Sequence, residues 1–321
     1  MNTLNARLGD ILKNNRVTDD DVLAVRREVY GDGVITPVEA DFIFRINELG
    51  DKPQSWNELF VEAITSFLVH QTMPHGYINQ ANAAWLMARI DHDGIVETQT
   101  EIELLLRVLE KSRNATDSLE KYALEQVKQA VVYGRGALAN GRELKPGHIG
   151  EAEVEMLRRV LYACASEGGI GISKLEAEAL FDLSDMLGDE GHHESWQTLF
   201  VGAIANHLMM LAAWEEPDMA EALRREKWLE SRGRGFVVPS FKGFGEAFKS
   251  MFSSETGLEF SNQNQSATTY AERVDEIEAV WLIDRLNRDG KLSANEKVLL
   301  RFLRDESPDI HAALIPYIKA A

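Results

Sequence analysis

The chain has 321 residues, 45% of them hydrophobic and 27% charged, which is typical of a soluble globular protein long enough for two domains. Its net charge of −18 argues against nucleic acid as a partner, because phosphate binding requires clustered Lys and Arg. A single cysteine, the absence of an apolar run of about 18 residues and an N-terminus without a leader pattern predict a cytoplasmic protein.

Apolar residues recur at helical spacing along most of the chain, and alternating Val, Ile and Thr runs are nearly absent. After Glu39, the stripe of Phe42, Ile43 and Ile46 predicts one amphipathic helix. A second stripe runs over 56–68, and it is repeated over 196–208 with His207 where the first copy has Phe67. Stripes of this kind form cores, so we expect an all-α fold in which His207 is a hydrogen-bonded core residue.

A hydrophobic residue, a short polar step and a glutamate precede an apolar helix four times along the chain. In three of the copies we interpret the Ser or Thr three residues before the glutamate as half of a helix capping box. The hydroxyl caps the helix while the glutamate bonds back to the cap residue, and the pair stabilises the helix start by about 1 kcal/mol. These three predicted capping boxes are Thr36 with Glu39, Ser173 with Glu176 and Ser293 with Glu296.

The first half of the chain aligns with the second, which predicts an internal duplication. The match places Ser55-Trp56 on Ser195-Trp196 and Asp93-Gly94 on Asp289-Gly290, with insertions in the second copy. A glycine-rich stretch over 134–147 breaks the helical pattern between the copies. We therefore predict two tandem helical domains, at 1–138 and 139–321, with an insertion in the second at about 215–270.

The Asp-Gly turns before three of the glutamates suggest a second interpretation, a calcium loop of EF-hand type. Such loops place oxygen ligands at positions 1, 3, 5, 9 and 12 around a glycine at position 6. The loop from Asp91 to Glu101 comes nearest to this pattern, although arginine takes the first position here (Arg89) and in the last loop (Arg285). The candidate ligands for Ca²⁺ or another divalent cation are Asp91, Asp93, Glu97, Glu101, Asp289, Glu296, Asp32 and Glu39.

The pairing of two Asp-Gly-x-hydrophobe-Ser/Thr-x-x-Glu loops in each half resembles the tellurite-resistance TerB family. The resemblance covers about 17–110 and 149–305, so it is present as two tandem copies. It implies an all-α domain with EF-hand-like loops and a role in metal binding and stress response near the membrane. The family's acidic positions correspond to Asp32, Glu39, Asp91, Asp93, Asp289 and Glu296.

The insertion at about 215–270 departs from the repeat, because its phenylalanines follow near-helical spacing with lysines on the other side. One interpretation is a helix that docks on a partner protein or lies on a membrane surface. The other is a strap that packs on the domains, which would avoid a large exposed apolar patch. The candidate partner-binding residues are Phe241, Phe244, Phe248 and Phe252.

Taken together, these patterns predict a non-catalytic cytoplasmic module that binds a protein partner and a divalent cation. The envelope-associated stress response is implied by the family resemblance alone. Two alternatives stay open: a metal-assisted hydrolase with Asp91, Asp93 and a histidine as ligands, and a purely structural scaffold.

Overall fold

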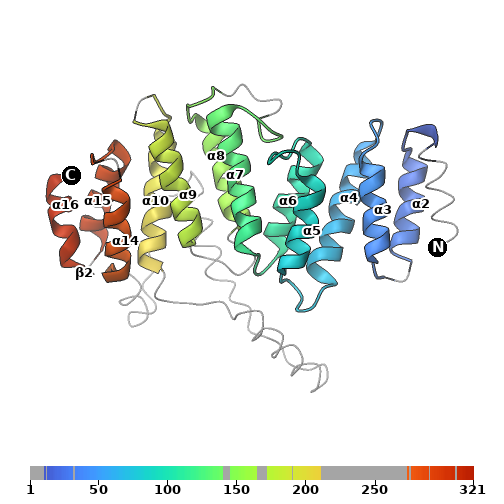
Figure 1. Cartoon of the computed structure of the whole chain (residues 1–321), viewed down its shortest axis with the longest axis horizontal. Helices are drawn as coiled ribbons and strands as arrows, with labels where there is room; N and C mark the ends of the chain where they lie inside the picture. The colour runs from blue at the N-terminus through green and yellow to red at the C-terminus, as the bar shows by residue number, and fades with distance from the viewer. Residues whose placement is uncertain are drawn as a thin grey trace, which may run out of the picture. The chain divides into compact units, whose positions relative to one another are not determined.

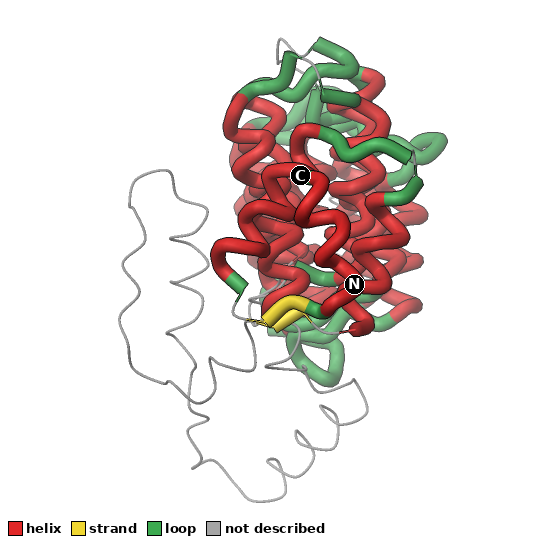
Figure 2. The backbone as a smooth tube through the Cα atoms, turned by 90° about the vertical axis from the view of Figure 1, so that its left-hand side faces the viewer, coloured by secondary structure: helices red, strands yellow, loops and turns green. Residues whose placement is uncertain are grey.

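The computed structural model describes residues 11, 13–31, 33–139, 145–164, 172–189, 191–210, 273–274, 276–288, 290–307 and 309–321. This part of the chain is mostly helical (Figure 1), which confirms the all-α class. Its two strands, β1 (Arg273–Val274) and β2 (Asp309–Ile310), are short and pair in parallel (Figure 2). The described residues divide into two compact units, and the division falls between Ala123 and Leu124.

Unit 1 contains the helices up to the start of α7. Helix α3 shows why they begin where they do, because Thr36 caps it and Pro37 takes the first position, where a missing N–H is not needed. Helix α4 runs directly into a π-helical turn, η1. The elements are α2 (Asp19–Val29), α3 (Pro37–Asn47), α4 (Gln54–Thr65), η1 (Ser66–His70), α5 (Gln80–Ile90), α6 (Gln99–Lys111) and α7 (Asp117–Tyr133), of which α7 extends past Ala123.

Unit 2 contains the rest of α7 and the later helices. Helix α7 ends at Tyr133, and Gly134 follows it with a φ of 64°, so the predicted break in the helical pattern begins at this point. The predicted domain boundary at 138–139 lies beyond the end of α7, whereas the two units divide within it. The elements are α8 (Glu151–Cys164), α9 (Lys174–Leu187), α10 (Glu194–Met210), β1, α14 (Glu276–Leu286), α15 (Ala294–Glu306), β2, η2 (Ala312–Leu314) and α16 (Ile315–Ala320).

Both predicted apolar stripes form cores. In unit 1, Trp56, Leu59 and Phe60 on α4 are completely buried. In unit 2, Trp196, Leu199 and Phe200 on α10 are buried in the same way. His207 lies on the α10 stripe and is also buried, with its Nδ1 atom 2.9 Å from the backbone oxygen of Ile172, as the sequence predicted.

Four aromatic rings meet in the core of unit 1. The ring of Phe44 packs edge-to-face on Phe60 and on Trp85, with centroid distances of 5.1 and 5.3 Å. The ring centroids of Phe67 and Trp85 are 5.4 Å apart, so α3, α4, η1 and α5 are joined through one ring cluster. Edge-to-face geometry is the arrangement that aromatic pairs prefer.

The same ring arrangement recurs in unit 2, where it joins α9, α10 and α14. Phe181 packs edge-to-face on Phe200 at 5.1 Å and on Trp281 at 5.7 Å, and His207 lies 4.8 Å from Trp281. Histidine thus takes the place of the fourth ring. In the register predicted from the sequence, the matching pairs are Phe44 and Phe181, Phe60 and Phe200, Phe67 and His207, and Trp85 and Trp281.

Candidate functional site

The three predicted capping boxes are present at the starts of α3, α9 and α15. In α3 the backbone N–H of Thr36 donates to Glu39 Oε2 at 2.8 Å, and the N–H of Glu39 donates to the Thr36 hydroxyl at 3.3 Å. Ser173 and Glu176 make the same pair of bonds at the start of α9, as do Ser293 and Glu296 at the start of α15. Glu39 and Glu296, two candidate metal ligands, therefore serve as helix caps.

Glu101 is also part of a helix cap, which the sequence interpretation missed. The N–H of Glu101 donates to the Thr98 hydroxyl at 3.2 Å, and that hydroxyl lies 2.7 Å from Glu101 Oε2. The signal was present as Thr98-Gln99-Thr100-Glu101, but aligning the loop with an EF-hand gave Glu101 the role of a displaced ligand. Its side chain is buried rather than turned to solvent.

Asp91 begins the best candidate loop, and both of its carboxylate oxygens accept hydrogen bonds. The Tyr122 hydroxyl from α7 donates to Oδ1 at 2.9 Å, and the backbone N–H of Gly94 donates to Oδ2 at 3.2 Å. Burial and the bond to Asp91 raise the pKa of Tyr122 well above its usual range, so this hydroxyl stays protonated and keeps donating. Asp91 thus ties the loop to α7.

The tip of this loop is a tight turn. Asp93 adopts a left-handed conformation with a φ of 54°, followed by Gly94 with a φ of 86°, and His92 and Ile95 pair across the turn. Asp and Gly are the residues that tolerate such angles, which accounts for Asp93-Gly94 in this loop. Asp93 and Glu97 are both exposed, so this turn explains the sequence of the loop without a ligand.

A lysine lies close to the start of α6 and contributes positive charge there. Lys52, in the connection before α4, donates its ammonium to the backbone oxygen of Asn47 at the end of α3. Burial lowers the pKa of Lys52, and the charge of Glu101 opposes that shift. Lys52 therefore supplies some of the positive charge that a cation would bring to Glu101.

The arginines at the first loop position pair with carboxylates on the neighbouring helix. In unit 1, the Arg89 guanidinium binds Asp41 of α3 and stacks over the Trp85 ring at 3.9 Å from its centroid. In unit 2, Arg285 binds Glu178 at 3.3 Å and Asp182 at 3.0 Å, both on α9. At this loop position the arginine therefore joins two helices in both units.

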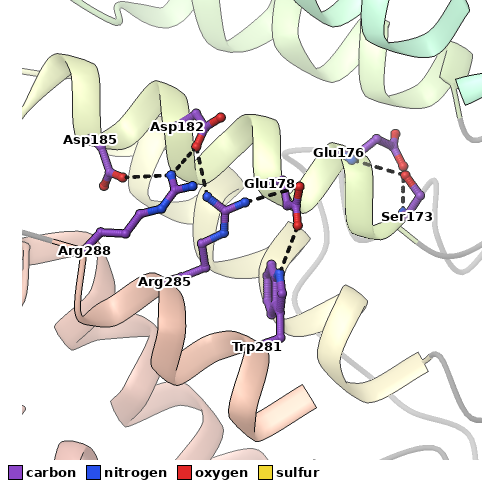
Figure 3. Close-up of polar contacts among 8 residues, drawn as sticks. All are labelled: Ser173, Glu176, Glu178, Asp182, Asp185, Trp281, Arg285 and Arg288. Carbon is purple, nitrogen blue, oxygen red and sulfur yellow. Dashed lines mark hydrogen bonds and ion pairs between the residues drawn. The ribbon is translucent and has the colours of Figure 1, made fainter. Parts of the chain in front are cut away.

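Figure 3 shows how this pairing extends along α9 and α14 in unit 2. Arg288 lies 2.5 Å from Asp182 and 3.8 Å from Asp185, and the Trp281 indole donates to Glu178 at 3.4 Å. The Arg285 side chain is only 6% exposed, so its charge is largely removed from water and compensated by two carboxylates.

In unit 2 a tyrosine hydroxyl again contacts the loop, but the loop side chain that it contacts is an amide rather than a carboxylate. Asn287 takes the place of Asp91, and its side-chain amide donates to the Tyr317 hydroxyl of α16 at 2.7 Å. Asp32 and Asp289 lie outside the described residues. Phe241, Phe244, Phe248 and Phe252 of the insertion also lie outside them.

The folded Asp91–Glu101 loop does not fit a resident divalent cation well. Both oxygens of Asp91 accept hydrogen bonds, from Tyr122 and from the Gly94 N–H, and Glu101 Oε2 accepts one from the Thr98 hydroxyl, so any ion would share these oxygens with the donors. Within the described ranges, no group of three or more His, Cys, Asp or Glu side chains is placed to hold a metal ion. Calcium sites need six to eight oxygen ligands, so a loop whose carboxylates are engaged in caps and turns is a poor start.

Comparisons of the chain with protein-family models, with curated proteins and with solved structures gave no match. In the part of the chain that the structure describes, no helix is both long enough and apolar enough to cross a membrane.

Proposed function

We propose that the protein is a non-catalytic cytoplasmic binding module made of two tandem TerB-like helical domains, and that α14 carries a contact surface for a partner protein. The observation that carries this proposal is a difference between α14 and its counterpart α5. In this proposal the capped loops have a structural role and do not bind cations.

The tandem arrangement is supported by contacts that match residue for residue. Each unit has the same four-ring cluster, an arginine that joins two helices and a tyrosine hydroxyl bonded to the loop. The short parallel pairings also correspond, since Tyr77 pairs with Asn114 in unit 1 and Arg273 with Asp309 in unit 2. Duplication of one ancestral domain explains all of these pairs together.

The contact surface is inferred from Ile277 and Val280, which lie one turn apart on α14. Their side chains are 79% and 59% exposed. In the predicted register, Ala81 and Ala84 occupy the same exposed positions on α5. Because β-branched residues favour helix formation less than alanine does, the described part of the fold gives no reason to prefer Ile and Val at these exposed positions.

The partner that suits this surface is a protein with an apolar contact point and a basic rim. Ile277 and Val280 stand beside acidic side chains of the same helix, Glu276 and Asp284, in a chain of net charge −18. Opposite charges around an apolar centre speed association and favour the correct partner.

Site-specific cross-linking tests the proposal. A photoreactive phenylalanine analogue is placed at Val280, and in a matched control at Ala84, in full-length protein inside the cells that produce it. We expect a discrete second protein to be cross-linked from position 280 and not from position 84. The exchange of Ile277 and Val280 for alanine, which copies α5, should reduce recovery of that protein at least about fivefold.

Two results would contradict the partner surface. Cross-links from position 280 that lead only to the 211–272 segment of the same chain would show that this face packs against the insertion and not against a partner protein. Equal cross-linking from positions 280 and 84 would show that the difference between α14 and α5 has no bearing on binding.

A further inference from the structure

The two residues before α9, Ile172 and Ser173, are held by side chains from two helices. Glu176 of α9 accepts the N–H of Ser173 at 2.7 Å. From α10, Asn206 accepts the N–H of Ile172 at 2.7 Å, and His207 Nδ1 lies 2.9 Å from the Ile172 oxygen. This stretch, Ile172–Ser173, is the α9 link.

Glu176 is the most deeply buried of the capping glutamates, with only 1% of its surface exposed. Its Oε2 atom makes the cap, but no described residue hydrogen-bonds the buried Oε1 atom. Burying a charged carboxylate with one oxygen lacking a hydrogen-bond donor costs free energy, and protonation removes the charge. Burial raises the pKa of Glu176 to about 7, even though the bonds from Ser173 lower it.

His207 stands on the other side of the link and is 3% exposed. Burial lowers the pKa of His207, while its bond to Ile172 raises it. Lys174 and Glu178 of α9 act on its pKa with opposite signs, and from α14 it faces the Trp281 ring. The neutral imidazole can donate from Nδ1 to the Ile172 oxygen.

Unit 1 holds the matching stretch without a deeply buried acid or a histidine. Glu39 is half-buried, and Phe67 stands where unit 2 has His207. The N–H of Ile35 is bonded by the amide oxygen of Gln71 at 2.8 Å, a group that does not titrate. The same backbone connection is thus capped in unit 2 by a fully buried acid beside a histidine, and in unit 1 by a half-buried acid with no histidine.

We propose that the α9 link is a pH-sensitive latch, held closed by the protonated Glu176 side chain and the neutral His207 imidazole, which loosens the start of α9 from α10 as the pH rises through neutrality. This proposal is independent of the partner surface on α14. It gives the two units different responses to pH.

The direction of the pH dependence follows from the pH ranges in which Glu176 and His207 titrate. A carboxyl whose folded pKa is raised stabilises the closed latch fully below its ordinary pKa of 4.5, and this stability is lost as the pH rises to about 7. His207, whose pKa is lowered from 6.5, acts in the opposite sense as the pH falls. Above pH 6.5 only Glu176 still contributes, so a rise through neutrality loosens the latch.

Hydrogen exchange measured in one molecule can compare the two units. Protection of the first two turns of α9 is followed from about pH 6 to about pH 7.5, corrected for intrinsic exchange, with the first two turns of α3 as reference. We expect α9 protection to fall roughly eightfold while α3 protection stays constant. Glu176→Gln should abolish the fall, His207→Phe should keep it, and Glu39→Gln should leave the α9 profile as in the wild type.

An equal pH response at the starts of α3 and α9, or a fall in protection that persists in Glu176→Gln, would overturn the latch. Because Glu176→Gln could loosen α9 at every pH, the wild-type protein supplies a second measurement. The carboxyl carbon of Glu176, observed by NMR in ¹³C-glutamate-labelled protein, should titrate near pH 7. A midpoint near 4.5 would overturn the proposal by itself.

Discussion

Unit 1 and unit 2 each have an apolar core with the same arrangement of rings, but they differ in how deeply they bury charged side chains. The ring clusters have nearly the same centroid distances in both units. By contrast, Arg89 is partly exposed where Arg285 is buried, and Glu39 is half-buried where Glu176 is fully buried. The apolar contacts are therefore alike in the two units, while the polar contacts around them differ.

The largest expected effect comes from removing one buried aromatic ring from the core of each unit. Phe60→Ala and Phe200→Ala each remove a completely buried ring, so each should lower the free energy of unfolding by about 3–5 kcal/mol. Urea denaturation with hydrogen exchange read separately in each unit measures both losses. If one ring costs less than about 1 kcal/mol, the two cores are not equivalent.

A smaller and unequal effect is expected from the arginines. Arg285→Met leaves Glu178 and Asp182 without their buried partner, but because these carboxylates reach solvent we expect a loss of about 2 kcal/mol. Arg89→Met should cost about 1 kcal/mol, from a more exposed ion pair and the Trp85 stack. Thermal denaturation measures the loss of stability in each variant. A larger loss for Arg89→Met than for Arg285→Met would contradict the difference in charge burial between the units.

The smallest effect concerns the cap that the sequence interpretation missed. Thr98→Ala removes the hydroxyl that caps α6 and should cost about 1 kcal/mol. Thr100→Ala, two residues further along the same helix start, is the matched control and should change stability by less than about 0.5 kcal/mol. Equal effects in urea denaturation would mean that Thr98 is not the cap.

The core and the caps could be predicted because each depends on residues close together in sequence. The stripe over 56–68 needs only helical periodicity, and Thr36 with Glu39 needs only a four-residue pattern. Thr98 was overlooked because the Asp-Gly turn before it invited comparison with a calcium loop. Local patterns were thus sufficient, except where two of them overlapped.

The ion pairs and the burial of Glu176 could not be predicted in this way. Arg285 and Asp182 are 103 residues apart in the sequence, and nothing local indicates that α14 packs on α9. Ser173 with Glu176 reads like the other capping boxes, yet only the packing around α9 leaves Glu176 Oε1 without a donor among the described residues. Such properties arise from the assembled helices.

We propose that the repeated loops are helix caps and turns rather than cation sites, and calorimetry tests this proposal most directly. Chelator-treated protein is titrated with Ca²⁺, Mg²⁺, Mn²⁺ and Zn²⁺, alongside a variant that combines Asp91→Asn with Asp93→Asn. We expect no saturable heat and no shift in Tm for any ion in either protein. Saturable binding that is present in the wild type and lost in the variant would contradict the claim and restore the cation loop.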